Sequence, residues 1–241
     1  MNYNYKSLNW DSKFFGFPVF DLSCSNCDAR NLRILLDELR EDQGRLVYWA
    51  VDPADAVSNK AAKESHAKLV DVKTTLSLGL IEEDEKSTCT HIFECTDPSS
   101  FELQELESLA LQCGQYSRFN MDPEIPTERF QQMYFAWIRK SIDHKLADVV
   151  FIFREHDQIQ GFVTLVYLND HGNIGLLAVD EKSRGKRIGF ELCSVVKKKL
   201  WRNGQKSVCV TTQLKNTGAI KFYEKFGFKR IRMMNIYHIW L

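Results

Sequence analysis

A cluster of cations around two glycines is the first feature of the sequence that suggests chemistry. The segment EKSRGKRIGFELC, Glu181–Cys193, places four cations around Gly185 and Gly189 and then becomes apolar at helical spacing. Backbone N–H groups at a helix start lack intrahelical partners and carry the positive end of the dipole, and glycines let a phosphate approach the main chain. The segment therefore predicts a pyrophosphate-binding loop. The alternative is a strand-to-helix turn with solvated lysines, and a Walker loop is excluded because no Gly-Lys-Ser/Thr is present.

The elements that must position this loop follow from hydrophobic periodicity. Apolar residues from Ile188 to Leu200 recur at helical spacing, and Asn203-Gly204 ends the pattern. Asn216 is a plausible N-cap for the next helix, which Gly227 closes. The predicted order is a strand at 172–180, the loop, a helix from 188, a strand at 207–212, a helix at 217–226 and an alternating strand at 228–241.

The rest of the chain divides into two predicted units. The acidic stretch EEDEKSTCT, Glu82–Thr90, lacks periodicity and is typical of a linker. We expect a small α/β domain over residues 1–85 and a second domain over residues 90–241. The first would hold strands at 18–24, 45–51 and 68–80 and a helix at 29–41. The second would open with helices at about 99–112 and 126–142 and strands at 148–155 and 159–168.

Composition limits the class of protein. Lys plus Arg and Asp plus Glu both equal 32, so no global field would steer the chain to nucleic acid or to an anionic membrane. Apolar runs such as Phe162–Leu168 are far shorter than the roughly 18 residues of a membrane span, and the start resembles no targeting segment. We therefore expect a cytoplasmic protein. The seven cysteines are typical of reduced thiols, and the pair Cys24 and Cys27 lacks the further ligands of a zinc site, so no metal is predicted.

A known family matches the order of these elements. The series strand, RGKRIG, helix, strand and NTGAIKFYEKFGF resembles the acetyl-CoA-binding half of GNAT-type N-acetyltransferases over about residues 90–241. The resemblance implies an α/β GNAT fold, with a mixed, mostly antiparallel central sheet flanked by helices, preceded here by the small α/β domain. One departure is Arg187, which stands where the first glycine of the loop usually is, a change that a helical backbone would tolerate.

The resemblance also implies roles for individual residues, with acetyl-CoA as co-substrate. Backbone groups near Leu177, Ala178 and Val179 would bind pantetheine, and an N–H there would polarise the thioester carbonyl. Tyr223 would be the general acid that protonates the departing thiolate; the alternative is a core aromatic beside Phe222. The residues implied to hold the rest of CoA are Arg184, Gly185, Lys186, Arg187, Ile188, Gly189 and Asn216.

Segments upstream suggest the acceptor. LNWDSKFFGF, QYSRFNMDPEIP, WIRKSI and IGLLAV together resemble the TDP-fucosamine acetyltransferases, which acetylate the C4 amine of a TDP-linked 4-amino-4,6-dideoxygalactose. The resemblance implies that Asp71 accepts the amine proton through ordered water; the alternative is an outward strand residue. Tyr116, Arg118 and Phe119, together with Ser117, would bind the sugar nucleotide; the alternative is a helix terminus whose Arg118 pairs with an acidic neighbour, Asp122 or Glu124.

Other functions remain open at the level of sequence. The chain is also compatible with a GNAT enzyme that acetylates another small molecule or a peptide amine, and with a non-catalytic acyl-CoA-binding module. An exposed alternating strand at the C-terminal end could pair across a homodimer.

Overall fold

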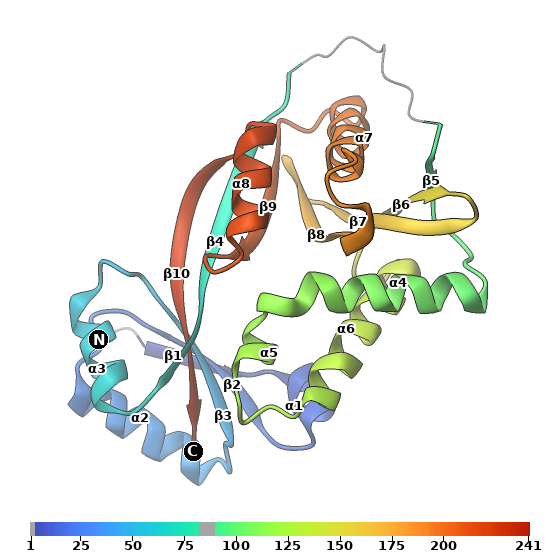
Figure 1. The fold of residues 1–241 in the computed structure, drawn as a ribbon. Coiled ribbons are helices and arrows are strands. Elements are labelled where there is room, and N and C mark those ends of the chain that lie inside the picture. The colour runs from blue at the N-terminus through green and yellow to red at the C-terminus, as the bar shows by residue number, and fades with distance from the viewer. Residues whose placement is uncertain (1–2, 82–89) are drawn as a thin grey trace.

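A computed structural model describes residues 3–81 and 90–241, whose strands form one mixed sheet flanked by helices (Figure 1). The elements of the first part of the chain are β1 (Tyr3–Ser7), α1 (Asn9–Phe15), β2 (Val19–Cys24), α2 (Ala29–Glu41), β3 (Leu46–Val51), α3 (Ala56–Glu64) and β4 (Lys68–Gly79). Those that follow are β5 (Ile92–Glu94), α4 (Ser100–Cys113), α5 (Arg118–Met121), α6 (Thr127–Ile142), β6 (Val149–Glu155), β7 (Gln158–Tyr167), β8 (His171–Val179), α7 (Ile188–Arg202), β9 (Ser207–Gln213), α8 (Thr217–Phe226) and β10 (Lys229–Trp240).

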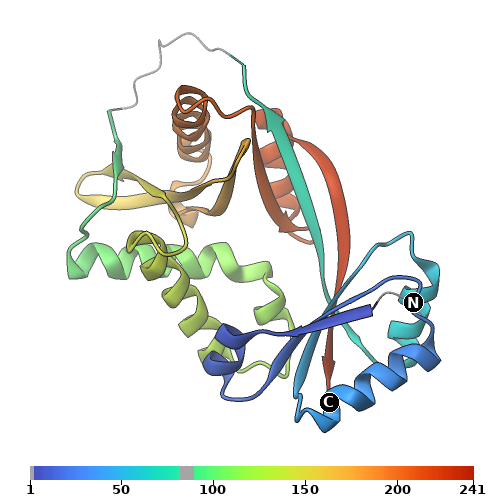
Figure 2. The same cartoon turned by 180° about the vertical axis from the view of Figure 1, so that it is seen from behind.

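The last strand joins the two halves of the sheet. The strand order is β1-β2-β3-β10-β4-β9-β8-β7-β6-β5, and only the β2–β3 and β8–β9 pairs are parallel. Residues 235–240 of β10 pair with β3, while residues 229–238 pair with β4. Figure 2 shows β4 and β10, in teal and red, running together from one half into the other. One hydrogen-bonded framework therefore carries both halves, and the predicted mixed, mostly antiparallel sheet is confirmed.

Alternating side chains give the sheet two apolar faces, which different helices cover. On one face, α1, α4, α5 and α6 bury residues such as Tyr48, Ile138 and Phe162. On the other face, α7 and α8 cover the C-terminal half, and α2 and α3 cover the N-terminal half around Trp49. The long amphipathic helices thus fix the sheet from both sides.

Most long elements lie where periodicity predicts them. The predicted helix at 29–41 is α2, and Asp28 caps it by accepting the Asn31 N–H at 2.9 Å. His156 and Asp157, both at positive φ, form the turn between β6 and β7, in the gap between the predicted strands at 148–155 and 159–168. The sequence did not predict β1, α1, α3, β5 or α5, each a short element. The predicted linker lies, up to residue 89, outside the described residues, and the division at 85–90 stays a prediction.

Candidate active site

The strands β8 and β9 pair over part of their length and then separate. Their parallel ladder ends at Ile174 and Val210, although β8 continues to Val179 and β9 to Gln213. A bulge in β8 at residues 175–176 starts the separation, because two residues there face one residue of β7. Thr164 Oγ1 accepts the Leu176 N–H at 2.8 Å and so holds the bulge in place. The separation gives the end of β8 an edge that faces a cavity rather than β9.

A cavity of about 1000 Å³ opens at this separation, between β8, β9 and the start of α7, and extends under α4, α5 and α6. It brings together nearly all of the residues predicted from the sequence, from both halves of the chain. The predicted residues that line it are Asp71, Tyr116, Arg118, Phe119, Leu177, Ala178, Val179, Arg184, Gly185, Arg187, Ile188, Gly189, Asn216 and Tyr223. Lys186 is the predicted residue that does not line it.

The glycine loop closes one end of the cavity. Gly185 has φ +83°, and a Cβ there would meet no atom within 4 Å, so the backbone is open to a bulky ligand. Arg184 Nε donates to the Val179 carbonyl at 3.2 Å, which ties the loop to the end of β8. The α7 helix then begins without a side-chain cap, which leaves its first-turn N–H groups without the usual partner. This arrangement fits an anion at the helix N-terminus.

Arg187 differs from the expectation. Its backbone has φ 66° and ψ 6°, the left-handed conformation, instead of the right-handed helical one that would tolerate a side chain without strain. The left-handed region brings Cβ close to the following carbonyl, which explains why a glycine usually stands at this point of the loop. The Arg187 guanidinium lies 5.1 Å from the Phe190 ring centre, a contact that offsets part of the strain.

The second helix of the site is fixed by Asn216. Its Oδ1 accepts the Ala219 N–H at 3.1 Å, so the predicted N-cap is confirmed, and Asn216 also lines the cavity. The cap orients α8, which presents Tyr223 to the cavity. Tyr223 is 4% exposed, and burial raises its pKa well above the usual value. The hydroxyl therefore carries its proton at neutral pH, as a general acid must.

Asp71 lies in the cavity wall, on the strand next to β9. The ladder between β4 and β10 shifts register between Asp71 and Leu69, so a bulge at Val70 sets the direction of the Asp71 side chain. Asp71 is 9% exposed, and burial raises its pKa to about 6, against the opposing effects of Arg118 and Lys73. The alternative in which Asp71 points outward is therefore wrong. At neutral pH this carboxylate is ionised and is a stronger proton acceptor than an ordinary aspartate.

Arg118 lies at the opposite wall, on α5. Its guanidinium is 4.1 Å from the Tyr48 ring centre and 4.6 Å from that of Phe119. The expected alternative partners are engaged elsewhere: Asp122 contacts His238 at 2.7 Å, and Glu124 contacts Lys68 at 2.9 Å. The aromatic faces hold the cation, which also acts electrostatically on the carboxyls of Asp11 and Asp71. A guanidinium in this place is suited to bind an anionic ligand.

Phe119 and Tyr116 contribute to this wall in different ways. Phe119 is only 3% exposed and packs edge-on against Tyr48 and Trp137, so its main contribution is to the core. Tyr116 is half-buried and lies in the short 3-10 turn before α5. Of these two rings, Tyr116 is the one with surface available for stacking on a ligand.

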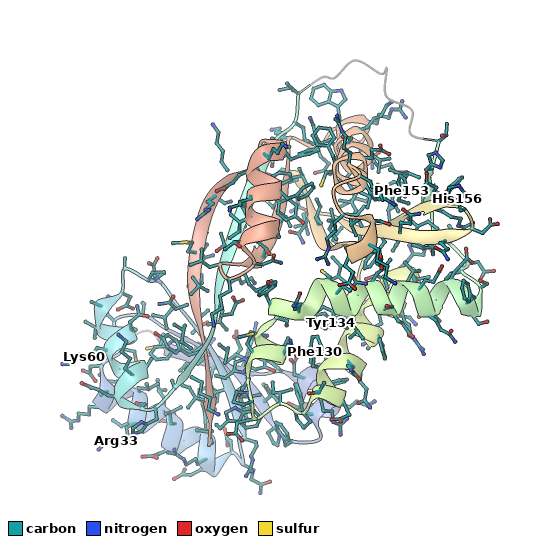
Figure 3. All side chains as sticks on the ribbon, viewed as in Figure 1. Arg33, Lys60, Phe130, Tyr134, Phe153 and His156 are labelled. Carbon is teal, nitrogen blue, oxygen red and sulfur yellow. The ribbon has the colours of Figure 1, made fainter. Side chains whose placement is uncertain are left out.

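Several wall residues were not predicted from the sequence. Lys73 follows Asp71 by two residues, and burial lowers its pKa, with Arg118 acting in the same direction. Its spacing in an alternating strand was a signal that could have identified it. Cys113, at the end of α4, and Tyr134, on α6, gave no such signal, because their meeting depends on how these helices pack. Figure 3 labels Tyr134 and Phe130 on α6, where it passes under α4.

Two classes of structure were not found. Within residues 3–81 and 90–241, no group of three or more His, Cys, Asp or Glu side chains is placed to hold a metal ion. In the same part of the chain, no helix is both long and apolar enough to cross a membrane.

Comparison with known proteins identifies the family. Residues 104–228 match the acetyltransferase (GNAT) family. The spore coat polysaccharide biosynthesis protein SpsD of Bacillus subtilis (strain 168) is 26% identical over 148 residues, 61% of this chain and 51% of that protein. N-alpha-acetyltransferase 30 of Saccharomyces cerevisiae is 32% identical over 68 residues, 28% of this chain and 39% of that protein. The chain thus spans about half or less of the length of these relatives.

A solved structure shows the same fold over nearly the whole chain. The GCN5-related N-acetyltransferase from Sphaerobacter thermophilus superposes with a TM-score of 0.64 at 14% identity, covering 99% of this chain and 76% of that one. The fold and the family predicted from the sequence are confirmed. With the family match covering more than half of its residues, the chain belongs to the acetyltransferase (GNAT) family.

Proposed function

We propose that this protein transfers the acetyl group of acetyl-CoA to the 4-amino group of a TDP-linked 4-amino-4,6-dideoxy sugar. The observation that carries the proposal is the cavity that begins at the glycine loop, follows the free edge of β8 and ends between Asp71 and Arg118. Its first part fits a pyrophosphate and an extended pantetheine arm, and its second part combines a proton acceptor with a cation. The site therefore suits the joining of a CoA thioester to an anionic amine.

Three groups supply the chemistry of direct transfer. Asp71 accepts the proton of the attacking amine, directly or through water, since its raised pKa lies closer to neutrality than that of an ordinary carboxyl. The Leu177 backbone N–H, on the free edge of β8, donates to the oxygen on which negative charge develops. Tyr223 donates its proton to the departing thiolate. Catalysis in this scheme needs no metal ion.

The acceptor end of the cavity favours an anionic substrate. Lys73 and Arg118 line it, and the charges of Lys215 and Arg232 act on Asp71 and Lys73 respectively. A nucleoside diphosphate would place its negative charge among these cations. The similar protein SpsD is named for spore coat polysaccharide biosynthesis, which supports an amino sugar as the acceptor. We propose that the reaction takes place in the cytoplasm. We also propose that a homodimer would pair through the exposed first residues of β10, Lys229–Met233, which lie beyond the stretch that pairs with β3.

A second candidate function is acetylation of a peptide amine. The match to N-alpha-acetyltransferase 30 favours it, although this match covers only 28% of the chain. Steady-state release of CoA thiol distinguishes the two, with the TDP-linked 4-amino sugar, its C4 epimer, simple amines and a peptide N-terminus as acceptors and mass analysis of the products. Fast turnover with one sugar epimer supports the proposal. Turnover confined to the peptide refutes the sugar acceptor, and CoA binding without any turnover would favour the non-catalytic module.

The donor site has its own test at Gly185. Asn and Asp both tolerate a left-handed backbone better than other side chains, and a Cβ at this position meets open space. Gly185→Asn and Gly185→Asp are therefore matched in shape and differ by one negative charge. We expect the Asp variant to bind CoA at least about tenfold more weakly than the Asn variant, because it places an anion beside the pyrophosphate. Equal CoA affinities, measured by calorimetry, would refute the assignment of the loop.

A further inference from the structure

We propose that Cys113 and Tyr134 form a rigid end wall of the acyl pocket, and that the Cys113 side chain limits the donor to acetyl-CoA. This inference rests on the proposed acetyl transfer and adds a determinant of acyl-chain length. Cys113 is the last residue of α4, and its side chain lines the cavity between the free edge of β8 and α8. No motif in the sequence points to this residue.

The position of the Cys113 sulfur follows from its neighbours. The Leu177 backbone lies next to the thiol, where it opposes the rise in the thiol's pKa, and the same sulfur lies close enough to Tyr223 to help raise the pKa of that hydroxyl. In the proposed reaction, Leu177 faces the acyl oxygen and Tyr223 faces the departing sulfur. The remaining substituent of the acyl carbon, its alkyl group, is then directed at the space beside Cys113.

The side chains behind Cys113 are packed too closely to move away from the pocket. A Cβ on the next residue, Gly114, would lie 2.6 Å from the Tyr134 ring, so this ring is in direct contact with the backbone at the end of α4. Tyr134 is 4% exposed and packs between Phe130, at 5.0 Å, and Trp137, at 4.9 Å between ring centres. Because close-packed aromatic side chains yield little, a longer acyl chain would collide with this wall instead of displacing it.

The wall acts through shape and not through covalent chemistry. Burial raises the pKa of the Cys113 thiol, so the group is protonated at neutral pH and lacks the thiolate that a nucleophile requires. A protonated thiol behaves as a small apolar side chain. Removing its sulfur frees roughly the space of one methylene group, which is the difference between acetyl and propionyl.

The test measures by calorimetry the binding of CoA, acetyl-CoA, propionyl-CoA and butyryl-CoA to the wild-type chain and to the Cys113→Ala and Cys113→Val variants. We expect wild type to bind propionyl-CoA at least about tenfold more weakly than acetyl-CoA, since one methylene in a tight pocket is worth about 10- to 200-fold. Cys113→Ala should reduce the ratio of acetyl-CoA affinity to propionyl-CoA affinity about tenfold. Cys113→Val should weaken the binding of acetyl-CoA while leaving the affinity for free CoA unchanged. Cys95→Ala is the matched control, because Cys95 is a buried thiol of the same core that does not line the cavity.

The outcomes separate the two proposals. Unchanged acetyl-to-propionyl ratios in Cys113→Ala, with CoA affinity intact, would overturn the wall and leave the proposed function standing. An equal change in Cys95→Ala would also overturn it, because the effect would then come from general loosening of the core. A wild-type protein that binds no CoA would overturn the proposed function and the wall with it.

Discussion

Replacing Asp71 with asparagine should stabilise the fold while removing the activity. Asp71 is 9% exposed, and its pKa rises from 3.8 to about 6 in the folded protein because burial disfavours the charged form. The folded state therefore binds this proton more tightly than the unfolded state, so the carboxylate destabilises the fold increasingly as the pH rises from about 4 to above 6. Asparagine has a similar shape and carries no charge to bury.

The size of the effect follows from the two pKa values. A difference of about two units corresponds to about 3 kcal/mol at pH 8, and to about half of that at pH 5, where much of the folded state is still protonated. Asp71→Asn should therefore raise the free energy of unfolding by up to about 3 kcal/mol at pH 8, and by less at pH 5. Urea unfolding of wild type and variant at both pH values, without substrate, measures this difference.

The substitution that stabilises the fold, Asp71→Asn, should lower the enzymatic activity. In wild type, kcat/KM should fall as the pH drops through about 6, because Asp71 becomes protonated and no longer accepts the amine proton. In Asp71→Asn, kcat should decrease about 10²- to 10⁴-fold, and the pH dependence near 6 should disappear. Asp37→Asn, at an exposed carboxylate on α2, serves as the control and should change stability by less than about 0.5 kcal/mol. A variant that is less stable at pH 8 than wild type, or one that keeps the acidic limb, would refute the reasoning.

Three further substitutions test the rest of the site. Tyr223→Phe should lower kcat about 10²- to 10⁴-fold with little change in acetyl-CoA affinity. The control Tyr237→Phe, which removes a hydroxyl that donates to Asn59, should leave kcat unchanged. Equal losses of kcat in the two variants would count against the acid role of Tyr223. Thr164→Val should destabilise the protein by about 1–3 kcal/mol and lower kcat, because the N–H of the β8 bulge loses its acceptor; unfolding and steady-state rates measure both. Arg187→Gly should stabilise the fold by about 1 kcal/mol in thermal unfolding, since it relieves a left-handed backbone, and a loss of stability would show that the contact with Phe190 outweighs the strain.

The sequence was most informative where local signals and function coincide. The cations and glycines around residue 187 predicted the phosphate loop, and the helix that follows begins at Ile188 as the periodicity indicates. Asn216 and Gly227 bracket α8, which places Tyr223 on the face toward the cavity. These features are local in the chain, so propensity and capping alone are enough to predict them.

Features that depend on pairing between distant segments could not be predicted. The bulge at residues 175–176 exists because β8 faces β7, and the bulge at Val70 exists because β4 faces β10. Apart from Gly175 in the first bulge, neither leaves a recognisable signal in the local sequence. Tyr134 reaches the cavity because α6 packs under α4, and the left-handed backbone of Arg187 depends on the tight path of the loop from β8 into α7. Such properties belong to tertiary structure and not to local preference.

The way in which β8 and β9 separate determines which of the proposed catalytic groups lie on the same side of the opening. β9 stays paired with β4 as far as Gln213 opposite Lys73, so Asp71 lies on the β4–β9 side of the opening. Tyr223 is on α8, which follows β9 directly, and belongs to the same side. Leu177 and the loop are on the other side, because β8 stays paired with β7 up to Val179. The proposed proton acceptor and the proposed acid are thus held on one hydrogen-bonded block, while the proposed oxyanion donor and phosphate loop are held on another. In the proposed reaction, the distance between the two sets of groups is therefore the width of the separation, which starts at the bulge bonded to Thr164.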